Sequence, residues 1–146
     1  TFELRSVSGD GDRVRATRPL EVTPVEVSLD APAEAMAGSL VPVGWVGPGY
    51  DRDYLAVQVP GEDGYVNYTY TEAGNPAEVL MPPTPGTYEL RYYLNQDATL
   101  MATREIVVIP VTASLDAPES VIAGSTVDIG WEGPDYDRDY IGVGRP

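Results

Sequence analysis

A stretch of ten residues occurs twice in this chain. Residues 45–54 read W-V-G-P-G-Y-D-R-D-Y and residues 131–140 read W-E-G-P-D-Y-D-R-D-Y, which is an offset of 131 − 45 = 86 residues. The offset holds without gaps, because residues 1–60 align with residues 87–146 at 30 identities in 60 pairs. A period this long exceeds that of solenoid repeats. It predicts that whole domains follow one another along the chain.

The boundary between units is expected near Thr23-Pro24 and again near Ile109-Pro110. Residues 24–109 would then be one full repeat. Residues 1–23 would be the C-terminal strands of a preceding repeat, and residues 110–146 the N-terminal strands of a following one. The last segment falls below the roughly 40 residues at which a domain folds alone. We therefore expect both terminal segments to pack against something else.

Within residues 24–109 apolar and polar residues alternate with a period of two, which is typical of strands with one buried face. Turn residues separate these runs at roughly 8–12-residue intervals, which favours about seven strands in a β-sandwich. The strands are expected at 25–29, 41–45, 55–59, 65–71, 77–81 and 87–94, with a last one that carries Ile106 and Val108. Residues 31–39, bounded by Pro32 and Gly38, are expected to form a turn-rich connection.

Two motifs resemble those of a known family. Trp45 ends a predicted strand and is followed by G-P and D-Y-L-A-V, and residues 85–92 read P-G-T-Y-E-L-R-Y. Both are similar to bacterial immunoglobulin-like repeats of the fibronectin-III type. Such units occur beside von Willebrand factor A domains and in other envelope or secreted proteins of Gram-negative bacteria.

The resemblance implies an all-β fold of tandem sandwiches with an 86-residue period. It implies that Tyr88 is a tyrosine corner whose hydroxyl bonds back to the backbone. Trp45 and Trp131 are expected in the core, in like surroundings. The core cysteine pair of antibody-type domains is missing, and the Trp lies on the second predicted strand, which favours the fibronectin-III-like variant.

Composition excludes several classes of function. The net charge is −14, and all nine basic residues are Arg, so nucleic acid and anionic membrane surfaces would be repelled. No apolar run is long enough to insert into a membrane. The chain has no Cys and no His, which excludes disulfides, thiol catalysis, the Ser-His-Asp arrangement and Cys- or His-ligated metals. Nothing pairs an acid with a base around a cleft, so no enzyme is expected.

The repeated loop carries the one candidate metal site. Asp51 and Asp53 lie two residues apart, as do Asp137 and Asp139, and carboxylates at this spacing could bind Ca²⁺ through oxygen. Arg52 between the first pair would oppose a cation, and the central Gly of an EF-hand loop is absent. The alternative is that Asp53 bonds the loop's own backbone N–H groups as an Asx turn. No other cofactor is expected.

The middle of the chain is rich in tyrosine. These residues are Tyr65, Tyr68, Tyr70, Tyr92 and Tyr93. Exposed tyrosines could stack on a glycan or anchor a protein partner. The alternative is that Tyr68, Tyr70, Tyr88 and Tyr92 lie at the rim of the core, in a chain that has a single Phe.

These observations favour a non-catalytic structural repeat of a larger extracellular, cell-surface or periplasmic protein. It would act as a stiff spacer or a filament-forming module, with adjacent repeats, and also other copies of itself, as partners. The alternative is a recognition module that binds a glycan or a Ca²⁺-bridged protein.

Overall fold

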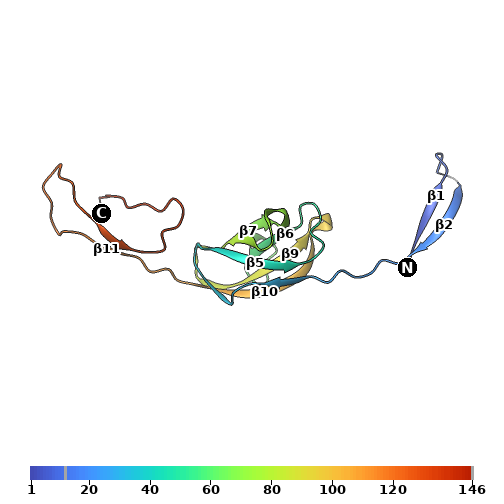
Figure 1. The fold of residues 1–146 in the computed structure, drawn as a ribbon, viewed down its shortest axis with the longest axis horizontal. Coiled ribbons are helices and arrows are strands. Elements are labelled where there is room, and N and C mark those ends of the chain that lie inside the picture. Colours follow the sequence, from blue (N-terminus) through green and yellow to red (C-terminus); the bar gives the residue numbers. More distant parts are fainter. Residues whose placement is uncertain (12, 146) are drawn as a thin grey trace.

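The computed structural model describes residues 1–11 and 13–145, and this part of the chain folds into β-strands joined by loops and two short 3₁₀ turns. Figure 1 shows three parts along one long axis: a hairpin at the N-terminus, a β-sandwich in the middle, and an open loop-rich segment at the C-terminus. None of the helical turns in the described residues has the length or apolarity needed to cross a bilayer.

The N-terminal hairpin consists of two antiparallel strands, and extended residues separate it from the sandwich (Figure 1). Its strands are β1 (Phe2–Val7) and β2 (Val14–Leu20). The C-terminal segment also contains one antiparallel pair. Its strands are β11 (Ser114–Asp116) and β12 (Gly130–Glu132).

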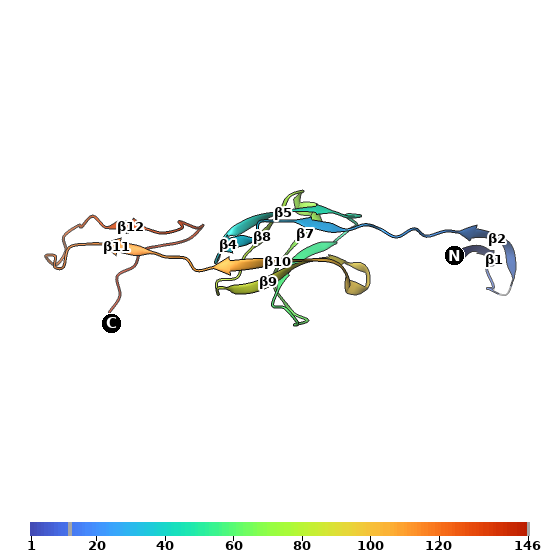
Figure 2. The same ribbon diagram turned by 90° about the horizontal axis from the view of Figure 1, so that it is seen from below.

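The central sandwich has two sheets, which Figure 2 shows with β5 on one side and β9 and β10 on the other. The three-stranded sheet has the order β3-β5-β8, from β3 (Ser28–Asp30), β5 (Leu40–Val46) and β8 (Ala77–Leu80). The five-stranded sheet has the order β4-β10-β9-β6-β7, from β4 (Glu34–Met36), β6 (Tyr54–Gln58), β7 (Tyr65–Tyr70), β9 (Gly86–Leu94) and β10 (Thr99–Ile109). The 3₁₀ turns are Thr71–Ala73 and Gln96–Ala98.

Alternating side chains from both sheets fill the interior. On β9 the buried residues are Tyr88, Leu90 and Tyr92, spaced by two, because successive side chains of a strand point to opposite faces. Further buried residues of the core cluster come from β5, β6, β8 and β10 and from Met81, among them Val41, Val43, Leu55, Val57, Ala77, Val79, Met81, Ile106 and Val108. All of these residues lie between 24 and 109.

Tyr88 and Trp45 lie at opposite edges of this interior. The buried Tyr88 donates from its hydroxyl to the carbonyl oxygen of Thr84 at 2.9 Å, a bond to the backbone a few residues upstream. Trp45 is half-buried against the core, and its indole N–H donates to the Gly74 carbonyl at 2.9 Å. Its backbone is held by the side chain of Asn75, which donates to the Trp45 carbonyl at 2.7 Å.

The terminal strand pairs have the same register as pairs inside the sandwich, 86 residues away. Phe2 lies opposite Leu20, as Tyr88 lies opposite Ile106. In the same way Leu115 lies opposite Trp131, as Leu29 lies opposite Trp45. The sequence correspondence is therefore also a correspondence of strand pairing.

Several expectations from the sequence need correction. The connection 31–39 contains a strand, β4, which pairs in parallel with the end of β10, so residues 24–109 hold eight strands and not seven. The first expected strand is shorter, because β3 begins at Ser28 and Val25 is exposed.

Trp131 is a further correction, because it does not lie in a core. Its side chain is 48% exposed, whereas Trp45 packs against Tyr92 with a ring-centroid distance of 6.0 Å. The surroundings differ because residues 110–146 hold no counterpart of Tyr92 or Asn75. The backbone pairing of the two Trp residues is alike, but their packing is not.

The equivalent residues Leu90 and Leu4 provide a matched test of this description. Leu90 is fully buried and Leu4 is 54% exposed. We expect Leu90→Ala to lower the free energy of unfolding by about 2–5 kcal/mol, through lost burial and a residual cavity. Leu4→Ala should change it by less than about 0.5 kcal/mol, as for other surface substitutions. Chemical denaturation of both variants measures this, and equal losses would contradict the described core.

Candidate functional site

The carboxylate of Asp53 is the most constrained polar group in the sandwich. Its side chain is 1% exposed and lies just before β6. One oxygen, Oδ2, accepts from the backbone N–H of Tyr50 and from the hydroxyl of Tyr92, both at 2.9 Å. The other, Oδ1, accepts from the backbone N–H of Asn95 at 3.0 Å. A buried carboxylate needs such donors, because without them the free energy of hydration that it loses on burial would not be offset.

The loop around Asp53, residues 47–54, is tied to its neighbours by further bonds. The Tyr92 hydroxyl accepts from the Gly49 N–H at 3.1 Å and donates to the Asp53 carboxylate. One side chain of β9 therefore binds two separate positions of the loop. The Asp53 carbonyl accepts from the N–H of Thr71 at 2.9 Å and from its hydroxyl at 3.1 Å. The arrangement joins the ends of β6, β7 and β9 and acts as a structural clamp.

This geometry bears on the predicted calcium ligands. One Asp53 oxygen accepts from the Tyr50 N–H and the Tyr92 hydroxyl, and the other accepts from the Asn95 N–H, while Asp137 is exposed on a separate loop in the C-terminal segment. Asp139 bonds the Tyr136 N–H at 3.0 Å, as Asp53 bonds Tyr50. Within residues 1–11 and 13–145 no three acidic side chains gather as a metal-binding group. Asp51, Asp53, Asp137 and Asp139 therefore belong to no such group, and both carboxylate oxygens of Asp53 already accept hydrogen bonds.

A cluster of five tyrosines covers the outer face of the five-stranded sheet. Tyr54 lies opposite Tyr70 on β7 and opposite Tyr93 on β9, and it faces away from the interior because the next residue, Leu55, is in the core. This cluster, called the tyrosine face below, consists of Tyr54, Tyr65, Tyr68, Tyr70 and Tyr93. Tyr92, which the sequence grouped with them, lies on the inner face.

The rings of the tyrosine face contact one another. Tyr54 stacks on Tyr93 at a centroid distance of 5.1 Å. Tyr68 meets Tyr65 edge-on at 4.9 Å and Tyr70 edge-on at 5.4 Å. The three residues on β7 are each more than two-fifths exposed. This is an aromatic surface whose exposed part is formed by the three residues on β7.

A polar network that the sequence did not indicate lies beneath this surface. Gln58 is buried, although its side chain is on the outer side of the sheet. Its Oε1 accepts from the Tyr93 hydroxyl at 2.7 Å and from Arg91 at 3.2 Å, and Arg91 pairs with Glu89 at 2.6 Å. Gln58 and Arg91 are 33 residues apart, so only the pairing of β6 with β9 brings them together.

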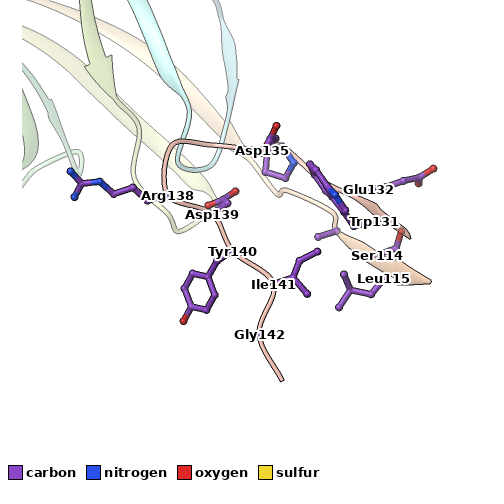
Figure 3. Close-up of a pocket in the computed structure, with 13 residues that line it drawn as sticks. Ser114, Leu115, Trp131, Glu132, Asp135, Arg138, Asp139, Tyr140, Ile141 and Gly142 are labelled. Carbon is purple, nitrogen blue, oxygen red and sulfur yellow. The ribbon is translucent and has the colours of Figure 1, made fainter. Parts of the chain in front are cut away.

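A hollow in the C-terminal segment is the second candidate site (Figure 3). Its apolar lining includes Leu115, Trp131 and Ile141. Their counterparts 86 residues earlier are Leu29, Trp45 and Leu55, which belong to the core of the sandwich or pack against it. The apolar residues that line the hollow therefore correspond in sequence to residues that the second sheet covers in the sandwich.

No family model matches the chain, and neither the curated proteins nor the solved structures contain a match.

Asp53 and its counterpart Asp139 allow a matched test of the clamp. Asp53→Asn places an amide donor where three donors converge, and we expect a loss of about 1–3 kcal/mol in unfolding free energy, the usual cost of a buried unsatisfied group. Asp139→Asn, on an exposed loop, should change it by less than about 0.5 kcal/mol. Denaturant titration of the two variants compares them. An unchanged Asp53→Asn protein would show that the clamp contributes nothing.

Tyr92 makes the fold sensitive to alkaline pH. Burial of the ring, with a smaller contribution from the Asp53 carboxylate, raises the pKa of Tyr92 to about 12, although the bond from Gly49 acts in the opposite direction. In the unfolded chain tyrosine has a pKa of about 10. The stabilisation is therefore fully present below pH of about 10 and is lost as pH rises through about 12, a change of about 2–3 kcal/mol.

Thermal melts between these pH values, on the native chain and on Tyr92→Phe, test this dependence. The variant should lose much of the alkaline slope. Some slope should remain, because burial also raises the pKa of Tyr54. A slope identical to that of the native chain would assign the alkaline sensitivity to other groups.

Proposed function

We propose that the chain is part of a tandem array of immunoglobulin-like units of the fibronectin-III type, spaced by 86 residues. Residues 24–109 would be one unit, flanked by the last strands of a preceding unit and the first strands of a following one. The observation that supports this most is the shared register: the hairpin pairs as β9 pairs with β10, and β11 pairs with β12 as β3 pairs with β5.

The role we propose for the array is that of a stiff, non-catalytic spacer or filament in a larger extracellular, cell-surface or periplasmic protein. The junction at Ile109-Pro110 supports stiffness. β10 runs to Ile109, and Pro110 follows at once. Proline fixes its own φ angle and restricts the residue before it to extended conformations, so this junction has few ways to bend.

The composition agrees with this role. A net charge of −14 on a chain without Lys or His keeps such rods apart in solution. The buried polar groups around Asp53 are engaged in holding the fold, as the bonds to Tyr50, Tyr92 and Asn95 show.

A second candidate function is recognition of a glycan through the tyrosine face. The observation that favours it is the exposure of Tyr65, Tyr68 and Tyr70 on one surface, because aromatic rings with a polar tip stack on the apolar side of sugars and bond their hydroxyls. A glycan array that gives the same signals for the native chain and for Tyr68→Ala would remove this candidate.

Stiffness can be measured on a polypeptide that carries several successive units. We expect electron microscopy to show nearly straight particles whose length grows by a constant step per unit. Insertion of a short Gly-Ser segment between Ile109 and Pro110 should introduce a bend at that junction, because such linkers behave as flexible coils. Freely kinked beads in the unmodified polypeptide would contradict the spacer role.

A further inference from the structure

An aromatic ring of the C-terminal segment contacts the backbone of the sandwich. A Cβ atom built on Gly38 would lie 3.3 Å from Cε2 of Tyr136, so the tyrosine ring rests on the glycine backbone. The phenolic oxygen of Tyr136 is shielded and receives no hydrogen bond from the described residues. The ring, and not the hydroxyl, therefore makes this contact.

The sandwich side of the contact is a rigid turn, residues 36–39. The N–H of Ala37 donates to Ile109 at 2.9 Å and the N–H of Gly38 donates to Pro82 at 3.1 Å. Gly38 has φ +75°, a conformation that favours glycine. The turn is thus fixed to the end of β10, close to the junction with the next segment, and it presents bare backbone.

The C-terminal side is the repeated loop, residues 134–139. The carboxylate of Asp139 accepts from the Tyr136 N–H, and the Asp139 N–H donates to the Tyr136 carbonyl, both at 3.0 Å. Arg138 has φ +71°, as Arg52 has φ +60° in the first copy of the loop. The loop thus holds Tyr136 in a defined place. Figure 3 shows that Asp135, Arg138 and Asp139 of this loop lie toward the sandwich strands.

Both halves of this contact recur in the chain without a partner in the part that the structure describes. Tyr50, the counterpart of Tyr136, is 59% exposed. Gly124, the counterpart of Gly38, has φ +80°, and nothing lies within 4 Å of the position of its Cβ. The sandwich therefore carries the glycine turn, with Gly38, at one end, and the exposed Tyr50 at the other.

We propose that the tyrosine-on-glycine contact is the joint between successive units, which rests on the proposed tandem array. Tyr50 would pack on the glycine turn of the unit before it, and Gly124 would receive the tyrosine of the unit after residues 110–146. Such a head-to-tail contact uses two different surfaces, so it can be repeated along an array without limit. The junction prolines restrict the backbone, and this ring sets the direction of the next unit.

Val111, next to the junction, supports the same assignment. It packs against the core cluster of the sandwich, whereas its counterpart Val25 is exposed. Before Val25 lie an extended stretch and a two-stranded hairpin that ends at Leu20, and neither forms a sandwich. The apolar residue after the junction proline is therefore covered where a sandwich precedes it.

Pulsed electron–electron double resonance, which measures the distance between two spin labels, tests the joint on the 146-residue chain. The chain has no Cys, so Thr87→Cys and Ser120→Cys, both at exposed positions, place one label on the sandwich and one on the C-terminal segment. We expect a single narrow distance peak in the otherwise native chain. Tyr136→Ala should lose the narrow peak, and Tyr136→Phe should keep it. Tyr50→Ala, the matched control, should also keep it.

Each result decides between the proposals. A narrow peak that survives Tyr136→Ala would overturn the joint but leave the stiff array standing. A broad distribution in the native chain would overturn the stiff array itself. Loss of the peak in Tyr50→Ala as well would show that the effect is not specific to the contact, and would also overturn the joint.

A second pair of variants approaches the same contact from the glycine side. Asn tolerates positive φ better than other residues with a side chain, so Gly38→Asn adds bulk under the ring with limited backbone strain. It should lose the narrow peak. Gly124→Asn, where the space is open, should keep it, and the same peak in both variants would overturn the joint.

Discussion

A strand with one apolar face is stable only when another layer covers that face. The structure of this chain follows from where that condition is met. Between residues 24 and 109 two sheets cover each other, and residues such as Leu90, Val43 and Leu55 are removed from water. The same alternation in the terminal segments pairs two strands in the same register, but Leu4 and Leu115 stay exposed because no second sheet lies over them.

Polar groups set the geometry that hydrophobic burial leaves open. Burial alone does not specify how the loop before β6 crosses the end of the sandwich. The Asp53 carboxylate specifies it, because its two oxygens need donors and find them on the loop itself, on Tyr92 and on Asn95. On the outer side of the sheet, Gln58 and Arg91 do the same for the tyrosine face. Each group is satisfied only in one arrangement of β6 and β9.

Local patterns predicted β5, β6, β8 and β9, since their alternation is visible in each run of residues. The alternative for Asp53 predicted a bond to a backbone N–H of the loop, but the bond goes back three residues to Tyr50 and is not an Asx turn. What the sequence did not reveal depends on distant partners. β4 has three residues and is a strand only because β10 pairs with it. The alternation with Tyr88 and Leu90 placed Tyr92 on the inner face, but it did not identify Asp53, 39 residues away, as the partner of its hydroxyl. Trp131 resembles Trp45 locally, but the residues that bury Trp45 have no counterpart in its segment.

The central claim is that residues 110–146 have the inner face of a sandwich and lack only its cover. Acrylamide quenching of Trp131 fluorescence tests it most directly, in a Trp45→Phe polypeptide to which a second copy of residues 61–109 is joined after Pro146. Pro146 corresponds to Pro60, so the copy continues in the same frame. The reference is a Trp131→Phe polypeptide, in which Trp45 is the fluorescent residue. The account predicts that the quenching of Trp131 falls to the level measured for Trp45 in that reference. Quenching that stays as strong as in the 146-residue chain would contradict it.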